Sequence, residues 1–425
     1  MTGLLHAGPA LADKHADVRP AAQDATTTLH TWNNVALAAV RKAQSIDAAA
    51  ARTYAMVNVA IYDAVNSIVS RGGRANAVVN AGDAPFEANL SATIAGAAHA
   101  VLVAVFPDQA ATFDAQLAAD RAALGHGGRV TTGLAWGAFV GNAVVARRAH
   151  DGASPAETVP AATGVGVFRA SWSNAQYRNL APFAIADAGP YVAGPPPDLN
   201  SPAYAGAVNE IKVIGNAAAT DVEATNRFQF WNLAAGTDQP AGEWLKIAIE
   251  VAEAQHVRLA DEVRLLALVS MAEADVVAPI YMSKFVYAEW RPATAIIEAG
   301  TDNNPFTDPD PSWKPRAGGI GGNPAHTSGH SAFSAAAAAV LDGFFCRDDI
   351  AFTHTNDGAP NGAARSYAGF QAAVFEAGRS RVEGGIHFEF NNQAGLAAGR
   401  GVGAEILAHS LLRVSAQTHF GTCPL

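Results

Sequence analysis

The sequence predicts an all-α protein built from two helical bundles, and three observations support this fold class. Long alanine-rich segments carry apolar residues at spacings of three and four, as at Tyr54, Val57, Ile61 and Val65, which is the spacing of one buried helix face. Alternating apolar and polar residues, the pattern of a half-buried strand, are scarce. A stretch rich in proline and glycine, residues 151–200, separates the helical segments into two groups.

The first group contains four predicted helices joined by short turns, which is typical of a bundle. A helix around residues 54–68 is followed by one over 91–106 that stops at Pro107, one over 109–124 that stops at a glycine cluster, and one from about 136 to 151.

The second group follows the irregular connection. Ser201-Pro202 has the residue types of a helix N-cap and first turn. Predicted helices span 202–215, 221–234, 242–260, 262–290, 330–345, 363–379 and about 392–413, with a loop over 299–325. The expected organisation is a leader (1–27), a first bundle with its crossover (28–200) and a second bundle that carries the functional site (201–425).

Composition excludes several classes of protein. The chain has 425 residues, half of them hydrophobic, which is enough apolar surface for a large core and argues against disorder. Lys and Arg number 28 against 38 Asp and Glu, so the net charge of −10 excludes a global basic surface for nucleic acid. No continuous uncharged apolar run is long enough for a membrane span. Two cysteines, Cys346 and Cys423, exclude a disulfide-dense scaffold but allow one bridge.

The N-terminal segment leaves the compartment open. Ala10-Leu11-Ala12 resembles a signal-peptide cleavage site, yet no basic residues precede it and His6 interrupts the apolar run. A signal remnant, and hence a secreted or periplasmic protein, and a polar leader on a cytoplasmic protein both fit.

Three segments of the second half carry residues suited to chemistry. The first contains Lys284 and Arg291, seven residues apart, followed by Pro292. On one continuous helix these two cations would lie two turns apart on the same face. The alternative interpretation is a pair of solvated cations near a helix C-terminus, where the helix dipole favours positive charge.

The second segment is His326-Thr-Ser328-Gly329-His330, which leads into an alanine-rich helix. A glycine-containing turn that opens a helix directs backbone N–H groups at one point, the geometry of an anion site. Ser328 adds a hydroxyl and His330 a titratable ring. The alternative is a simple N-cap followed by a surface histidine.

The third segment runs from Ser380-Arg381 to His387 through two glycines. The alternative here is that Arg381 pairs with Glu383 or Glu376 and that His387 is a core residue. Taken together, however, the three segments supply three cations, a hydroxyl, backbone donors and two histidines. This set forms a receptor for a tetrahedral or trigonal-bipyramidal oxyanion, since arginine presents forked donors to such oxygens.

In order and internal spacing, Lys-x6-Arg-Pro, Ser-Gly-His and Ser-Arg-x5-His resemble the signature of the vanadium haloperoxidase and type-2 phosphatidic acid phosphatase superfamily. Trp290, the run from Ser328 to Ser334 and Gly384 to Phe388 are most similar to bacterial vanadium-dependent haloperoxidases. The resemblance covers about residues 280–400 and, more weakly, 30–70. It implies the two-bundle haloperoxidase fold, vanadate as cofactor, hydrogen peroxide and halide as substrates, a small organic acceptor and a homodimer.

The resemblance also implies roles for individual residues. Lys284, Arg291 and Arg381 would neutralise the vanadate oxygens, and Ser328 and the Gly329 N–H would hydrogen-bond them.

The two histidines have separate roles in the family. His387 would ligate vanadium through a ring nitrogen, and His330 would act as the acid–base group. Under the alternative of a soluble acid phosphatase, His387 would attack phosphorus to form a phospho-histidine and His330 would protonate the leaving group.

Two positions depart from the family pattern. Asn391 stands where an aspartate often orients the ligand imidazole; its amide oxygen is expected to accept the same N–H bond, with less effect on basicity. Asn323 stands seven residues before His330, where an aromatic residue or histidine is usual, which favours bromide or iodide over chloride. A zinc site at His326 and His330 is a minor alternative, because a loop-to-helix turn is expected between them.

Overall fold

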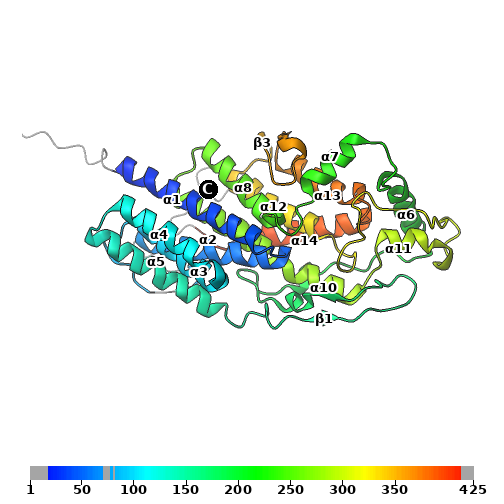
Figure 1. Ribbon diagram of the computed structural model, residues 1–425, viewed down its shortest axis with the longest axis horizontal. Coiled ribbons are helices and arrows are strands. Elements are labelled where there is room, and N and C mark those ends of the chain that lie inside the picture. Colours follow the sequence, from blue (N-terminus) through cyan, green and yellow to red (C-terminus); the bar gives the residue numbers. More distant parts are fainter. Residues whose placement is uncertain (1–17, 70–76, 80–81, 413–425) are drawn as a thin grey trace, which may run out of the picture.

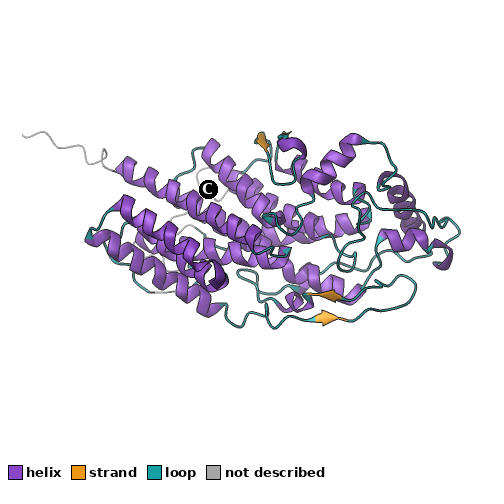
Figure 2. Cartoon of the chain, in the orientation of Figure 1, coloured by secondary structure: helices purple, strands orange, loops and turns teal. Residues whose placement is uncertain are grey.

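The computed structural model describes residues 18–69, 77–79 and 82–412 and is an elongated, almost entirely helical structure (Figures 1 and 2). The all-α prediction is confirmed. Residues 1–17 of the expected leader and Cys423 lie outside the described residues, while the first helix already begins at Val18. The expected two-bundle division stays a prediction, and the pairing of the two cysteines stays open.

The first half of the chain forms five long helices at one end of the molecule (Figure 1). Asn89 caps the third of them: its side chain accepts a hydrogen bond from Ala92 N at 2.8 Å. The helices are α1 (Val18–Lys42), α2 (Asp47–Val69), α3 (Leu90–Val105), α4 (Ala110–Leu124) and α5 (Gly128–Arg147).

The proline-rich connection contains little regular structure, as predicted. Its two short strands, β1 (Thr158–Val159) and β2 (Trp172–Ser173), pair antiparallel along one side of the molecule (Figure 2). The connection also contains the short 3₁₀ helices η3 (Ala175–Asn179) and η4 (Gly189–Tyr191). The other 3₁₀ helices of the described residues are η2 (Pro107–Gln109), η5 (Ala299–Thr301) and η6 (Pro360–Gly362).

The second half begins with the cap that the sequence predicts: Ser201 Oγ accepts from Tyr204 N at 3.1 Å, and Pro202 is the first helical residue. One small antiparallel sheet, β3 (Phe352–His354) with β4 (Arg365–Tyr367), lies among the helices. The helices are α6 (Pro202–Ile214), α7 (Val222–Trp231), α8 (Gln239–Ala254), α9 (Leu259–Asp275), α10 (Val277–Tyr287), α11 (Pro292–Ile297), α12 (Gly329–Phe345), α13 (Phe370–Glu383) and α14 (Glu389–His409).

Helix α9 lies at the centre of the fold. It contacts α1, α2, α8, α12 and α14, and one continuous core of buried side chains extends across both halves of the chain. The stretch Leu259–Tyr287 is the one candidate among the described residues that is long and apolar enough to cross a membrane. Its most apolar window is 94% buried inside the protein, as in a core helix.

Two expectations about local structure were wrong. The helix expected over 262–290 is divided at Val276 into α9 and α10, and α10 ends at Tyr287, because Ala288 adopts a left-handed conformation with φ of 43°. Arg291 is therefore the N-cap of α11 and does not share a helix face with Lys284. The helix expected from residue 363 begins only at Phe370, because residues 365–367 pair as strand β4.

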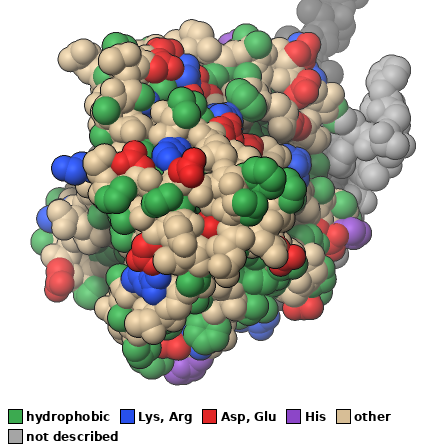
Figure 3. Space-filling model, turned by 90° about the vertical axis from the view of Figure 1, so that its right-hand side faces the viewer, with side chains coloured by type: hydrophobic (Ala, Val, Ile, Leu, Met, Phe, Trp, Pro, Cys, Tyr) green, Lys and Arg blue, Asp and Glu red, His purple; other side chains and the backbone are tan. Residues whose placement is uncertain are grey.

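The end of the molecule that carries α6 and α11 has a mixed surface (Figures 1 and 3). Basic side chains lie singly among acidic and hydrophobic ones in Figure 3, and the described residues form no extended basic patch on this face. This face therefore lacks the electrostatic footprint of a nucleic-acid-binding surface.

Helix α14 packs closely on α12, the helix that begins with Gly329 and His330. Gly395, Gly399 and Gly403 lie along the contact, where a Cβ would clash with backbone carbonyls of α12. Glycine at these positions allows the two backbones to approach and so sets the position of the start of α12.

We predict that Gly399→Ala lowers the free energy of unfolding by about 1–3 kcal/mol, because the added methyl overpacks the α12–α14 contact. The matched control is Gly206→Ala in α6, where the position is exposed and a Cβ meets no atom within 4 Å. That variant should gain about 0.5–1 kcal/mol from helix propensity. Urea denaturation followed by circular dichroism measures both, and equal effects would contradict the packing argument.

Candidate functional site

The residues predicted from the three motifs converge on one buried site. Lys284 comes from the last turn of α10, Arg291 from the N-cap of α11 and Arg381 from the last turn of α13. Arg291 Nη1 lies 3.0 Å from His387 Nε2. The charges of Lys284, Arg291, Arg381 and His330 all act on the His387 ring, so the five groups surround a common point.

The Arg291 guanidinium is held by backbone and amide oxygens. Its Nε donates to Asn323 O at 2.7 Å, its Nη2 to Asn323 Oδ1 at 2.9 Å and its Nη1 to Ile386 O at 2.6 Å. Gly321, at φ of 92°, packs against the guanidinium, and a Cβ there would lie 2.6 Å from Cζ. A side chain at this position would therefore displace the arginine.

The other two cations also rest on uncharged acceptors. Lys284 Nζ donates to Pro324 O at 2.6 Å, and Arg381 Nη1 donates to Trp231 O at 3.0 Å. The Arg381 Nε is buried without a hydrogen-bond partner. Among the described residues, none of the three cations forms an ion pair. Glu383 and Glu376, the alternative partners weighed for Arg381, instead bind Arg227 and Arg365.

Burial and mutual repulsion disfavour the charged forms of these groups. Desolvation, with the charge of Arg291 added, lowers the pKa of Arg381 to about 9. Desolvation lowers the pKa of Arg291 to about 10, and desolvation followed by the charge of Arg291 lowers that of Lys284 well below its usual range. Three buried cations without an ion-pair partner are an electrostatically incomplete arrangement, which a multiply charged anion would complete.

The start of α12 supplies neutral donors to the same site. Ser328 is its N-cap: Oγ accepts from Ser331 N at 3.4 Å and lies 2.7 Å from Ser331 Oγ. Ser331 Oγ also lies 2.8 Å from the acceptor Asn392 Oδ1, and its one hydrogen can go to only one of these two oxygens. Gly329 opens the helix, and the backbone donors of this first turn favour an anion.

The two histidines have defined ring states. Arginine only donates, so His387 Nε2 accepts from Arg291 and the proton of the neutral ring is on Nδ1, which is buried without a partner. His330 Nε2 donates to Asn232 O at 3.0 Å, which leaves Nδ1 as the acceptor of the neutral ring. Burial, followed by the neighbouring cations, lowers the pKa of both histidines well below the usual range. Both rings are therefore neutral near pH 7.

Asn391 does not orient His387, which corrects the expectation from the sequence. Its Oδ1 accepts from Phe388 N at 3.0 Å, and its Nδ2 donates to Glu289 Oε2 at 2.7 Å and lies 3.2 Å from His326 Nδ1. The Asn391 side chain thus links the start of α14 to the segment that precedes Arg291.

The minor zinc alternative also fails within the described residues. His326 Nε2 lies 2.8 Å from Gly194 O, and helix α12 begins only after His326. No group of three metal-binding side chains exists in the described part of the chain.

Four residues near the site carried no sequence signal for the contacts they make. Asn232 accepts from His330 through its backbone and lies 3.5 Å from Arg381 Nη2 through Oδ1. Glu289 is buried beside Lys284 and Arg291, and burial raises its pKa to about 8. Asp47 and Asn323 line a cavity beside the site. Contacts made through backbone carbonyls or across more than two hundred residues leave no local pattern.

A cavity of about 400 Å³ adjoins the cluster of predicted site residues. We call this cluster the cradle; its members are Lys284, Arg291, Ser328, Gly329, His330, Arg381 and His387. Asn323, which binds Arg291, forms part of the cavity wall. The remaining lining residues are Ile46, Asp47, Ser171, Trp172, Ser173, Asn174, Ala235, Gln239, Tyr281 and Gly322. This mostly polar cavity is the candidate route to the cradle.

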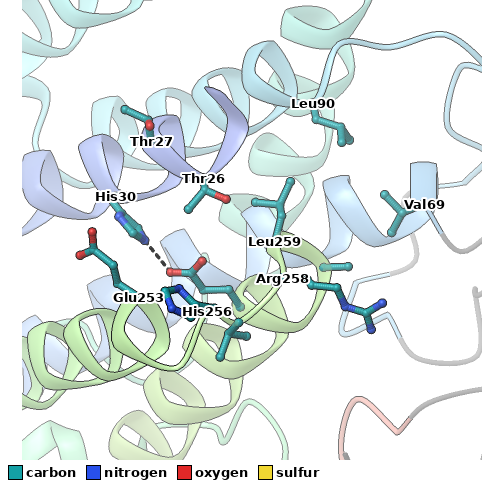
Figure 4. A pocket seen from close by; sticks show the side chains of 12 residues that line it. Thr26, Thr27, His30, Val69, Leu90, Glu253, His256, Arg258 and Leu259 are labelled. Carbon is teal, nitrogen blue, oxygen red and sulfur yellow. Dashed lines mark hydrogen bonds and ion pairs between the residues drawn. The ribbon is translucent and has the colours of Figure 1, made fainter. Parts of the chain in front are cut away.

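A second cavity, of about 560 Å³, lies elsewhere, where α1 meets the α8–α9 junction (Figure 4). It contains His30, whose Nε2 lies 2.5 Å from Glu262 Oε1, with Glu253 and His256 nearby in the same view. The hydrogen bond that the His30 ring donates to Glu262 raises the pKa of His30. No residue lines both this cavity and the cavity beside the cradle.

Comparison with known proteins agrees with the three motifs. Residues 264–415 match the family model of the VCPO second helical-bundle domain. A bacterial vanadium-dependent iodoperoxidase structure aligns with a TM-score of 0.76 at 22% identity, over 90% of this chain and 96% of that one. No curated protein sequence matches significantly.

Two structures of bacterial vanadium-dependent chloroperoxidase, one holo and one apo, also align. Each has a TM-score of 0.63 at 14% identity over 84% of this chain, covering 90% of the holo chain and 92% of the apo chain. The resemblance to the vanadium haloperoxidases is confirmed, and the chain has their fold.

We predict that Glu289→Gln reduces the pH dependence of stability. Unfolded Glu289 ionises near its ordinary pKa of 4.5, whereas the folded protein holds the proton until about pH 8. Wild-type stability is therefore fully present below about pH 4.5 and declines as the pH rises to 8, by roughly 1.4 kcal/mol for each unit of pKa difference. Glutamine keeps an oxygen acceptor for Asn391 and cannot ionise.

Urea denaturation at pH 5 and pH 8 measures this difference. The variant should lose less stability between the two pH values than the wild type. Glu87→Gln, the same chemical change at an exposed position, is the control. Parallel pH profiles for wild type and Glu289→Gln would contradict the assignment.

Proposed function

We propose that this chain, which has the vanadium haloperoxidase fold, is a vanadate-dependent haloperoxidase that oxidises halide with hydrogen peroxide. The observation that carries the proposal is the cradle itself, in which Lys284, Arg291 and Arg381 are buried together against carbonyl and amide oxygens. This donor set fits vanadate, because the oxyanion supplies the missing negative charge and accepts from guanidinium forks and helix N–H groups.

The chain's own residues bind and orient the oxyanion. Arg291 is fixed by Asn323 and Ile386, so its position does not depend on the ligand. Arg381 has an Nε donor without a protein partner, so it can donate to the bound oxygens, and Ser328 adds its hydroxyl at the start of α12. A cradle assembled before binding loses little conformational entropy when the ligand enters.

His387 supplies the ligand atom. Its Nε2 lone pair faces Arg291 and the other cations, and its low pKa keeps that lone pair unprotonated. Bound vanadate would act as a Lewis acid that activates hydrogen peroxide towards halide. His330, neutral and fixed by Asn232, is placed to accept a proton at Nδ1 and return it.

The substrates follow from the same proposal. Hydrogen peroxide and halide would enter through the polar cavity bounded by Asn323 and Gln239, and a small organic acceptor would react with the oxidised halogen. The amide of Asn323 gives this wall a polar character, which supports bromide or iodide over chloride. The homodimer stays a prediction from the sequence, and the cellular compartment stays open.

We predict that the purified protein loaded with orthovanadate brominates monochlorodimedone in the presence of hydrogen peroxide and bromide, and oxidises iodide. The soluble acid phosphatase remains the second candidate because His387 Nε2 is also placed as a nucleophile. Turnover of p-nitrophenyl phosphate together with inactivity towards bromide and iodide would favour the phosphatase and contradict the haloperoxidase.

We also predict that His387→Ala loses at least tenfold in vanadate affinity, because the ligand nitrogen is removed. His409→Ala, an exposed histidine near the end of α14, should bind vanadate like the wild type. Equilibrium dialysis with vanadium analysis measures affinity, and circular dichroism checks that both variants fold. Undiminished vanadate binding by folded His387→Ala would remove this residue from the ligand role.

A further inference from the structure

Asp47 is a carboxylate that no motif identified, and it stands between the cradle and the cavity. It is the first residue of α2, and its Oδ1 accepts from Ala48 N at 2.7 Å and from the Tyr281 hydroxyl at 3.1 Å. Tyr281 lies on α10, three residues before Lys284. One carboxylate oxygen is therefore fixed by two donors.

The second oxygen, Oδ2, faces the start of α12. A Cβ placed on Gly329 would lie 3.4 Å from it, which is ordinary contact distance. The negative charge of Asp47 also acts on Lys284. These two observations are independent, and both place the carboxylate beside groups that are expected to bind the oxyanion.

Asp47 is also the only charged side chain that lines the cavity next to the cradle, within the described residues. Asn323 and Gly322, which belong to the loop that holds Arg291, also line this cavity. Any molecule that reaches the cradle through this cavity passes a fixed negative charge.

We propose that Asp47 is a specificity-determining residue that weakens binding of multiply charged oxyanions at the cradle, and that it repels them more strongly than it repels a singly charged halide or uncharged hydrogen peroxide. The inference rests on the proposed function and adds a control of selectivity to the same site. An oxyanion held by Gly329 and Lys284 would be repelled by the neighbouring carboxylate.

The charge of Asp47 also has an effect that favours anion binding, because it stabilises protonated Lys284. This effect is smaller once the anion is bound. Asp47 helps to keep Lys284 protonated, so its removal weakens one cation in the free protein. A bound oxyanion itself stabilises protonated Lys284, and Arg291 and Arg381 keep their charges. Removal of the carboxylate should therefore produce a net gain in anion affinity.

The test compares Asp47→Asn with Asp47→Glu. Asparagine keeps an oxygen that accepts from Ala48 and Tyr281 but removes the charge, while glutamate keeps the charge. Isothermal titration calorimetry with inorganic phosphate, and separately with orthovanadate, measures affinity without any assay of catalysis. Asp47→Asn should bind both oxyanions about tenfold more tightly than the wild type. Asp47→Glu should stay within about threefold of the wild type.

Unchanged or weaker binding by folded Asp47→Asn would overturn this inference, while oxyanion binding by the wild type would still support the cradle. Absence of oxyanion binding by wild type and variant alike would overturn the proposed function and this inference with it. If Asp47→Asn does not fold, Asp47→Ser, which also removes the charge, carries the same expectation. A purely structural role would change the unfolding midpoint without tightening either oxyanion.

Discussion

The burial of three like charges in one place is the constraint on which the rest of this site depends. Lys284, Arg291 and Arg381 are each held by carbonyl or amide oxygens, which accept part of their hydrogen bonds without neutralising their charges. Carboxylates in the same positions would form ion pairs and remove the binding capacity. The stability given up by this arrangement is recovered when an oxyanion enters, so the free energy of binding is coupled to the stability of the site.

The helical framework places these charges with little freedom. Close contact between α12 and α14 at Gly399 positions the start of α12, and Asn391 links the start of α14 to Glu289 just before Arg291. The carbonyl groups of Trp231 and Asn232 at the end of α7 complete the wall. The rigid elements thus bring together side chains from segments that are far apart in the sequence, which is how a preorganised site is usually built.

Much of the cradle could be predicted because its residues occur in short local patterns. Ser328, Gly329 and His330 are adjacent, and their turn chemistry predicts a helix start, which the structure contains, with backbone donors suited to an anion. The relative position of Lys284 and Arg291 was harder to predict, because the left-handed turn at Ala288 interrupts the helix without a glycine to signal it. The role of Asn391 was misassigned, since a residue four positions from His387 need not contact it when a new helix begins between them.

By itself, the sequence determined the all-α fold class, the chemistry of the cradle and the resemblance that names its fold, because helix periodicity and motif spacing are local properties of the chain. Only the tertiary structure decided which oxygens hold each cation, which ring nitrogen of His387 accepts from Arg291, and that Asp47 lies beside Gly329. The physical reason is that these contacts join helix ends and backbone carbonyls across long separations, and their geometry is set by packing of the whole core.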